Sequence, residues 1–265
     1  MTDLVGAVAL AERLADAAAV EIRARFRHSY KVETKEDVTP VTEADRAAER
    51  AMRAILAAEC PQDGVAGEEY GAAGGSSGLT WVLDPVDGTK AFMSGRPTFV
   101  TLIALLDGDR PVLGIIDQPI VRDRWIGVAG QPTTLNGAPI RTRACADLGA
   151  ASFSTTAPEL FPADDAPVYR ALSAGAGLRT YGGDGYAYGL LAAGWIDLVL
   201  EAGLKLHDFA ALAPVVEGAG GVMTDWSGRP LRSESSGRVL AAGSPELHAQ
   251  LLERIRAIRA DRLDS

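Results

Sequence analysis

The sequence contains only two cysteines, Cys60 and Cys145, and neither lies in a CxxC pattern. Their scarcity argues against a zinc ribbon or a disulfide framework, and we expect both thiols to be reduced. Histidine is also scarce, because only His28, His207 and His248 are present. A histidine-rich transition-metal site is therefore hard to assemble from this chain.

Long apolar runs and a basic stripe are absent as well. A membrane-spanning helix needs about 18 apolar residues, and no uninterrupted apolar segment of the sequence is that long. Charged residues from Asp3 to Asp16 interrupt the apolar stretch near the N-terminus. We therefore expect no signal peptide, no membrane partner and a cytoplasmic protein. The formal net charge of −9 argues against a nucleic-acid partner. An acidic protein can still bind a phosphate if metal ions reverse the local field.

The composition is that of a globular protein, with 47% hydrophobic and 23% charged residues in 265. Apolar residues at three- and four-residue steps predict a helix over 3–26, and Thr42 is a candidate N-cap for a second helix ending near Glu59. Branched and aromatic runs predict strands at 81–84, 99–106, 112–116 and 125–128. The C-terminal part alternates, with helices predicted at 186–193, 208–219 and 245–259, and strands at 196–200, 222–224 and 239–242.

Acidic residues at the edges of these predicted elements are the candidates for chemistry. Asp84 closes a short apolar strand, and Asp87 follows three residues later, so both carboxylates can converge on a pair of cations. Gly88 permits a tight turn, and its amide together with that of Thr89 can form an anion-binding nest. The further acidic segments are Val41-Thr42-Glu43-Ala44-Asp45, Gly67-Glu68-Glu69 and His207-Asp208.

Each of these segments has an ordinary explanation when it is taken alone. Asp-Pro and Asp-Gly are common turns, Glu68-Glu69 can be a solvated pair, and Asp208 can be a helix N-terminal acid. Their joint occurrence is specific. So many carboxylates in one place repel each other unless cations are bound. Oxygen ligands select a hard ion such as Mg²⁺, Mn²⁺ or Ca²⁺.

Three motifs carry a resemblance to a known family. They are Gly67-Glu68-Glu69, Asp84-Pro85-Val86-Asp87-Gly88-Thr89, and His207-Asp208-Phe209-Ala210-Ala211 followed by Glu217-Gly218-Ala219-Gly220-Gly221. Together they resemble the inositol monophosphatase superfamily, and the resemblance runs from the first helix to about Gly243. It implies a layered αβαβα sandwich of the inositol monophosphatase and fructose-1,6-bisphosphatase type. One unit would fill 1–265, with an α+β half over 1–140 and an α/β half over 141–265.

The resemblance also implies roles for individual residues. Glu68, Asp84 and the backbone carbonyl of Val86 would hold one Mg²⁺, and Asp84, Asp87 and Asp208 a second, while Glu68 could help a weaker third. Mn²⁺ is a possible substitute. Asp45 and Thr89 would form a proton relay that activates the attacking water together with Glu68. The family usually has tryptophan where this chain has His207, which leaves Asp208 intact and changes the floor of the substrate pocket.

The substrate implied by the resemblance is a small phosphate monoester that binds near Asp87, Gly88 and Thr89. Lys90-Ala91-Phe92 departs from the Thr-Asn-Phe of the inositol enzymes and also fits the adenosine-bisphosphate branch. Later segments resemble histidinol-phosphate phosphatases: Phe99–Leu106, Gln118-Pro119, Arg124–Gly127, Tyr181–Tyr188 and Glu201–Lys205. We therefore predict a histidinol-phosphatase of histidine biosynthesis, with inositol-1-phosphate and adenosine 3′,5′-bisphosphate phosphatases as alternatives.

Histidinol phosphate carries an ammonium and an imidazole, so its non-phosphate end needs acceptors. Asp184 and Glu201 could supply them, although Asp184 could equally belong to a Gly-Asp-Gly turn and Glu201 be a surface acid at a strand end. Arg179 could meet the substrate or a neighbouring subunit, and a homodimer is typical of related enzymes. A non-catalytic metal-binding protein on the same fold remains an alternative from a different class. It predicts loss of a ligand or relay residue, whereas Asp45, Glu68 and Thr89 are all present.

Overall fold

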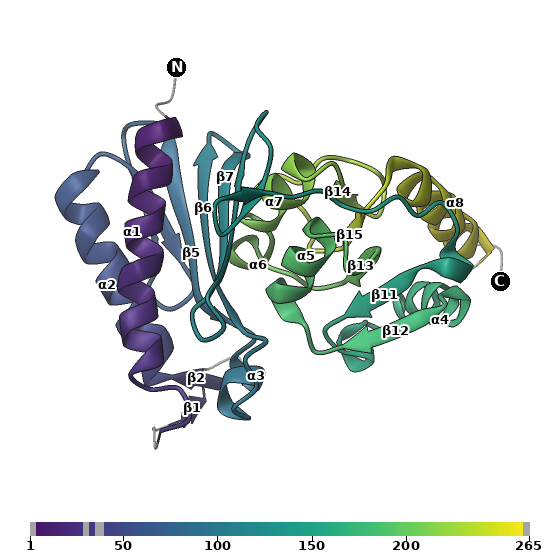
Figure 1. Cartoon of the computed structure of the whole chain (residues 1–265), viewed down its shortest axis with the longest axis horizontal. Helices are drawn as coiled ribbons and strands as arrows, with labels where there is room; N and C mark the ends of the chain where they lie inside the picture. The colour runs from purple at the N-terminus through teal and green to yellow at the C-terminus, as the bar shows by residue number, and fades with distance from the viewer. Residues whose placement is uncertain (1–3, 29–31, 35–39, 262–265) are drawn as a thin grey trace.

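Two β-sheets and three layers of helices build the molecule, as the computed structural model shows for residues 4–28, 32–34 and 40–261 (Figure 1). The larger sheet has eight strands in the order β10-β9-β8-β7-β6-β5-β3-β4, and the smaller has five in the order β12-β11-β13-β15-β14. This is the αβαβα sandwich that the sequence predicts. The division into halves at residues 140 and 141 stays a prediction.

The larger sheet is antiparallel except where β3 runs parallel to β5. Its strands are β3 (Gly64–Gly67), β4 (Gly71–Ala73), β5 (Leu79–Asp87), β6 (Val100–Asp107), β7 (Arg110–Gln118), β8 (Asp123–Val128), β9 (Thr134–Leu135) and β10 (Ala138–Pro139). In the smaller sheet β11 runs parallel to both of its neighbours. Its strands are β11 (Ser152–Thr155), β12 (Leu178–Tyr181), β13 (Leu198–Glu201), β14 (Val222–Asp225) and β15 (Val239–Ala242). A separate pair joins β1 (Val32–Thr34) to β2 (Pro40–Thr42).

The outer helices cover one face of each sheet, and a third group lies between the sheets. On the larger sheet the outer layer is α1 (Leu4–Arg23) and α2 (Glu43–Glu59). The middle layer is α5 (Asp184–Ala192), α6 (Leu206–Phe209) and α7 (Leu212–Gly218). On the smaller sheet the outer layer is α4 (Ala166–Gly175) and α8 (Pro245–Asp261). The described residues also include the short helices α3 (Thr89–Met93), η1 (Leu148–Ala150) and η2 (Pro158–Leu160).

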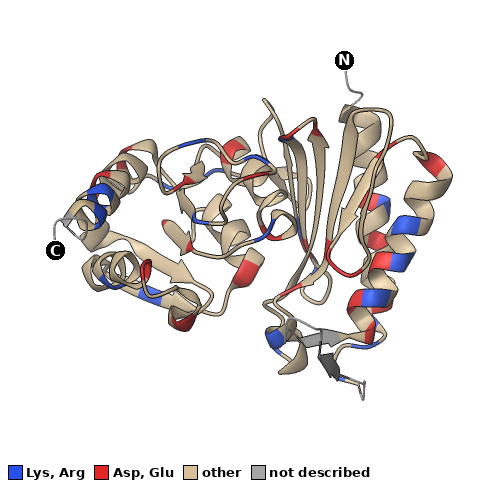
Figure 2. Cartoon of the chain, turned by 180° about the vertical axis from the view of Figure 1, so that it is seen from behind, with Lys and Arg blue, Asp and Glu red and all other residues tan. Residues whose placement is uncertain are grey.

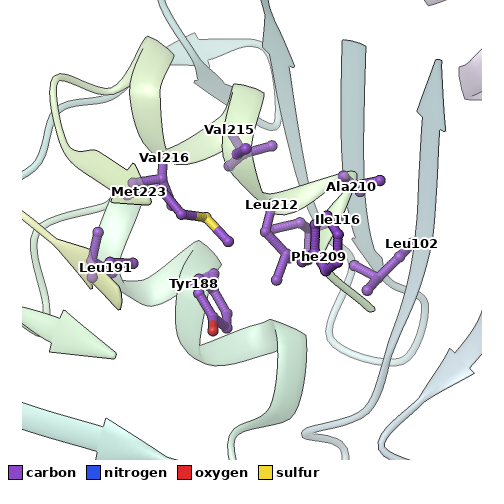
Figure 3. Packing of buried hydrophobic residues seen from close by; sticks show 14 of the residues in the cluster. Leu102, Ile116, Tyr188, Leu191, Phe209, Ala210, Leu212, Val215, Val216 and Met223 are labelled. Carbon is purple, nitrogen blue, oxygen red and sulfur yellow. The ribbon is translucent and has the colours of Figure 1, made fainter. Parts of the chain in front are cut away.

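Successive side chains of a strand in the larger sheet pack alternately against the outer and the middle helix layer. In β5, Trp81 and Leu83 pack against α1 and α2, whereas Val82 between them faces the middle layer. In the middle layer, Phe209 of α6 packs into the same cluster as Leu102 of β6 (Figure 3). The larger sheet is therefore apolar on both faces, which explains why its sequence reads as nearly continuous apolar runs.

Most predicted helix ends agree with the structure. Thr42 caps α2 as predicted: its hydroxyl accepts a hydrogen bond from the Asp45 amide, and the Asp45 carboxylate accepts one from the Thr42 amide. The Asp45 carboxylate thus fills the place that Glu or Gln has in a capping box. Ser244 caps α8, because its hydroxyl accepts a hydrogen bond from the Leu247 amide at 3.3 Å. Asp3, which the sequence places in the first helix, and residues 31 and 35–39 between the first two helices lie outside the described residues.

Several predicted boundaries were wrong. The single helix expected over 208–219 is divided into α6 and α7, because the α-helical pattern is interrupted at Ala210 and Ala211. The helix expected from residue 186 begins at Asp184, and the strand expected from residue 196 begins at Leu198. Among the described residues, no helix combines the length and apolar character needed to cross a membrane.

Candidate metal centre

Asp84 and Asp87 lie at the end of β5, where the pairing with β6 shifts register between them. Residues three apart on a regular strand point to opposite faces, so this irregularity is what lets the two carboxylates converge. The amide of Val86 donates to Asp84 Oδ1 at 3.1 Å and holds the turn. The Asp84 side chain is almost completely buried, with 2% exposure.

Asp208 completes this first group from the other end of the chain. It lies on α6, which packs against β5 and β6. The amide of Lys205 donates to Asp208 Oδ2 at 2.7 Å and fixes the carboxylate at the start of the helix. One carboxylate oxygen from each of Asp84, Asp87 and Asp208 lies within 4.8 Å of the others. The structure therefore brings together three of the predicted metal ligands.

Glu68 and His207 form a second group with Asp84. β3 runs parallel to β5 with Gly67 opposite Leu83, and the Glu68 amide donates to the Leu83 carbonyl at 3.1 Å. Glu68 therefore follows its strand directly beside Asp84. One ligand atom from each of Glu68, Asp84 and His207 lies within 4.8 Å of the others. His207, which the family resemblance placed at the floor of the substrate pocket, is thus a candidate ligand that was not predicted from the sequence. Its position next to Asp208 was the available signal.

The charges of the two groups fit a bound cation. Burial, followed by the charges of Glu68, Asp87 and Asp208, raises the pKa of Asp84 well above its ordinary value. Burial, followed by the charges of Asp184 and Asp208, does the same for the pKa of Asp87. Such carboxylates are stable as anions only when positive charge lies among them. The donor set, mostly carboxylate oxygens, fits a hard divalent cation.

The predicted relay residues lie in or beside this region. Asp45 on α2 is buried, and burial, with the charges of Glu69 and Glu68, raises its pKa to about 7. Thr89 is the first residue of α3, and its hydroxyl donates to the Val86 carbonyl at 3.3 Å. The hydrogen bonds described for these side chains pair Asp45 with Thr42 and Thr89 with Val86. A direct Asp45–Thr89 relay stays a prediction.

The Asp184 carboxyl group lies against Gly88 in the Asp84–Thr89 motif. Gly88 has a φ of +90°, and a Cβ there would come within 3.0 Å of the Asp184 carboxyl group. The next amide, that of Gly185, donates to Asp87 Oδ2. Burial raises the pKa of Asp184 to about 6, against the opposing effect of Arg96 and Lys90. Asp184 is the first residue of α5, so the Gly-Asp-Gly segment leads into a helix and is not an isolated turn.

Glu201 and Arg179 differ in their surroundings. Glu201 ends β13 with 2% exposure, so the surface-acid alternative is wrong. Its carboxylate accepts the Thr156 amide at 2.6 Å and the Thr155 hydroxyl at 3.3 Å, and burial raises its pKa to about 7. Arg179 lies on β12, an exposed strand at the edge of the smaller sheet.

Comparison with known proteins decides the family. The model of the inositol monophosphatase family matches residues 4–260. The chain belongs to this family. Members are metal-dependent phosphomonoesterases, and the acidic groups around Asp84 supply candidate metal sites in this one.

Relatives with assigned names fall on more than one branch of the family. The bifunctional phosphatase IMPL2 of Arabidopsis thaliana, a chloroplastic protein, is 46% identical over 95% of this chain and 75% of its own length. A histidinol-phosphatase of Streptomyces coelicolor is 38% identical over 95% of this chain and 97% of its own. A solved inositol monophosphatase from Zymomonas mobilis is 48% identical, with a TM-score of 0.88, over 97% of this chain and 100% of that one. These names leave the substrate open between branches.

Proposed function

We propose that this protein is a Mg²⁺-dependent histidinol-phosphatase, which hydrolyses L-histidinol phosphate to L-histidinol and phosphate. The observation that carries the proposal is a pair of neighbouring acids: the half-buried Asp184 lies against Gly88 of the motif loop, and Glu201 is buried. Asp184 and Glu201 act on each other electrostatically. A substrate with an ammonium and an imidazole suits such an acidic wall better than an uncharged polyol does. The named histidinol-phosphatase relatives support the same choice.

The metal ligands proposed here are the carboxylates of the two groups and the backbone carbonyl of Val86. Glu68, Asp84 and the Val86 carbonyl would hold one Mg²⁺, Asp84, Asp87 and Asp208 a second, and Glu68 a weaker third, with Mn²⁺ as a substitute. Bound Mg²⁺ would supply Lewis acidity at the phosphate oxygens and make water a better nucleophile. Both effects need the Asp84 carboxylate, because it belongs to both groups.

The proton chemistry falls to residues of the chain. We propose that Thr89 and Asp45, with Glu68, orient the attacking water and accept its proton. A general base works best when its pKa lies near the operating pH, and that of Asp45 is raised to about 7. The Thr89 hydroxyl donates to Val86 and keeps its oxygen free to accept a hydrogen bond from water.

The amides of Gly88 and Thr89, at the start of α3, would orient the phosphate, and Asp87 the adjacent part of the substrate. Asp184 and Glu201 would accept from the cationic end of the substrate, and Arg179 would contact it or a second subunit. A homodimer in the cytoplasm, without nucleic acid or membrane as a partner, remains part of this proposal.

Hydrolysis of inositol 1-phosphate is the second candidate, favoured by the 48% identity to the Zymomonas mobilis inositol monophosphatase. The test is a phosphate-release panel with histidinol phosphate, myo-inositol 1-phosphate, adenosine 3′,5′-bisphosphate and fructose 1,6-bisphosphate, each with Mg²⁺ and with EDTA. We expect the highest kcat/KM for histidinol phosphate and no release in EDTA. A preference for another ester would refute the substrate assignment. No release with any ester would favour the non-catalytic alternative.

A further inference from the structure

His207 places a nitrogen donor among the carboxylates of the site. A ring nitrogen of His207 lies within 4.8 Å of carboxylate oxygens of Glu68 and Asp84, and His207 Nε2 lies 3.4 Å from Asp208 Oδ1. The His207 side chain is only 17% exposed. In an octahedral site with bonds of about 2.1 Å, adjacent ligand atoms lie about 3.0 Å apart and opposite ones about 4.2 Å. Side-chain adjustments alone could therefore bring the three ligand atoms onto one ion.

The two groups differ in the chemistry of their donors. Asp84, Asp87 and Asp208 offer oxygen alone, which suits Mg²⁺, whereas the group containing Glu68, Asp84 and His207 adds an imidazole. Imidazole favours Mn²⁺, Co²⁺ and Zn²⁺ over Mg²⁺, because Mg²⁺ prefers oxygen ligands and gives up its water reluctantly. Since Asp84 belongs to both groups, the two ions would be neighbours.

We propose that His207 is a metal ligand and makes the Glu68–Asp84 position selective for a transition metal, while the Asp87–Asp208 position keeps Mg²⁺. The inference rests on the proposed metal-dependent function and deepens it, with a transition metal in place of Mg²⁺ at the Glu68–Asp84 position. It predicts an enzyme that is most active with two different divalent ions.

Direct binding tests this assignment without turnover. Metal-free protein is titrated calorimetrically with Mn²⁺, Co²⁺ and Mg²⁺, and nitrogen coupling to bound Mn²⁺ is measured by pulsed electron paramagnetic resonance. His207→Phe keeps a ring and removes the donor, so we expect at least a tenfold loss of Co²⁺ affinity, about 1.4 kcal/mol, loss of the nitrogen coupling, and little change for Mg²⁺. His248→Gln, which changes a histidine on α8, should leave all three affinities and the coupling unchanged.

Asp84→Asn separates failure of this inference from failure of the metal site itself. If Asp84→Asn weakens all metals but His207→Phe weakens none, the site stands and His207 is not a ligand. If Asp84→Asn changes no affinity, the proposed metal site is wrong as well. Nitrogen coupling that survives in His207→Phe would also overturn the inference.

A second inference comes from α2, along which acidic and basic side chains alternate (Figure 2). Glu49 on this helix is fully buried, and its carboxylate accepts hydrogen bonds from the amides of Glu69 at 2.8 Å and Tyr70 at 3.3 Å. Arg53, one turn later, donates to Glu49 Oε1 at 2.7 Å and to the Gly71 carbonyl. Two side chains of α2 therefore hold the segment after β3, through the amides of Glu69 and Tyr70 and the carbonyl of Gly71.

This turn carries Glu68, whose own amide is tied to Leu83 of β5. The Glu68 backbone is thus held between a strand on one side and the Glu49 carboxylate on the other. Gly67 is required for this arrangement, because a Cβ there would overlap the Glu49 carboxyl group. We infer that Glu49 and Arg53 are positioning residues that aim Glu68 at the metal position.

Glu49→Gln tests this role. Glutamine keeps the size of the side chain, but its NH₂ group replaces one of the two oxygens that accept hydrogen bonds from the Glu69 and Tyr70 amides. We expect roughly a tenfold loss of Mn²⁺ affinity. The Mn²⁺ affinity of Arg53→Lys should lie between that of this variant and that of the native protein. Asp197→Asn is the matched control: Asp197 is also fully buried and accepts hydrogen bonds from the Ser152 amide and Arg143, but it lies just before β13 of the smaller sheet. Both variants should be less stable, and only Glu49→Gln should bind Mn²⁺ more weakly. Equal affinities in the two variants would refute a positioning role.

Discussion

Replacing Glu201 by glutamine should separate recognition of the substrate from integrity of the fold. Glu201 accepts hydrogen bonds from the Thr156 amide and the Thr155 hydroxyl. The glutamine oxygen can keep the amide bond while its NH₂ group donates to Thr155, because a hydroxyl either donates or accepts. We therefore expect the free energy of unfolding to change by less than about 1 kcal/mol. The charge alone is lost.

The loss of this charge should appear in KM for a cationic substrate. A hydrogen bond to a charged group contributes about 1.5–3 kcal/mol, so KM for histidinol phosphate should rise roughly 10- to 100-fold. KM for an aryl phosphate without a cationic group should change less than about threefold, because it makes no such contact. The assay is steady-state phosphate release with both substrates at saturating Mg²⁺.

The pH dependence provides a second readout of the same contact. Burial raises the pKa of Glu201 to about 7, so the carboxylate is ionised above this pH and protonated below it. Native KM for histidinol phosphate should therefore fall as the pH rises through 7, and the difference from Glu201→Gln should be largest near pH 8. An equal KM change for both substrates, or a difference independent of pH, would refute the role given to Glu201.

Three further predictions concern stability. Mg²⁺ at roughly 100 times its Kd should stabilise the EDTA-treated protein by about 2.7 kcal/mol. Asp84→Asn should abolish that gain, yet in EDTA the variant should be more stable than the native protein, because it removes a buried charge. A metal-induced shift in the urea midpoint of the variant would contradict this. Burial lowers the pKa of His248 from 6.5 to about 4, so the unfolded state binds the proton first. Stability should therefore fall by about 3 kcal/mol as the pH drops between these two values. His248→Gln, which can keep the bond to Thr224, should remove that loss in urea titrations, and an unchanged slope would exclude His248 as its source. Gly114→Ala should lower stability by about 3 kcal/mol, because its Cβ would overlap the Ala211 carbonyl between the larger sheet and α7; an unchanged thermal midpoint would show that the layers can separate freely.

The sequence predicts those elements whose pattern follows from burial within one or two layers. The helix at 4–23 carries one apolar face, and β6 and β7 are long apolar strands in the middle of the larger sheet. β12 could not be predicted, because every residue of this edge strand is exposed and no alternation remains. β3 and β4 consist of Gly, Ala and one Val, so they carry little strand propensity, and their pairing with β5 defines them.

The same distinction holds for the site. Asp84 and Asp87 are recognisable because they lie in one short motif, and Asp208 because the sequence predicts a helix start there after a strand. The only sequence signal for His207 was its position next to Asp208, and its approach to Glu68 and Asp84 depends on the packing of α6 against β5. Glu49 is equally hidden: an acid one turn after Asp45 predicts an exposed helix face, and only the position of β3 shows that it is buried.

The parallel pairing of β3 with β5 explains why the site has two unlike groups of ligands. An antiparallel neighbour would place the end of its chain at the opposite edge of the sheet, away from Asp84. The parallel register instead puts Glu68 beside Asp84, while the irregularity in β5 turns Asp87 toward Asp208. Asp84 thus lies where a strand neighbour and a helix from the C-terminal half meet. Any change that shifts β3 along β5 should disturb the group containing Glu68 and leave the group containing Asp87 in place, so the two metal positions should be separable by mutation.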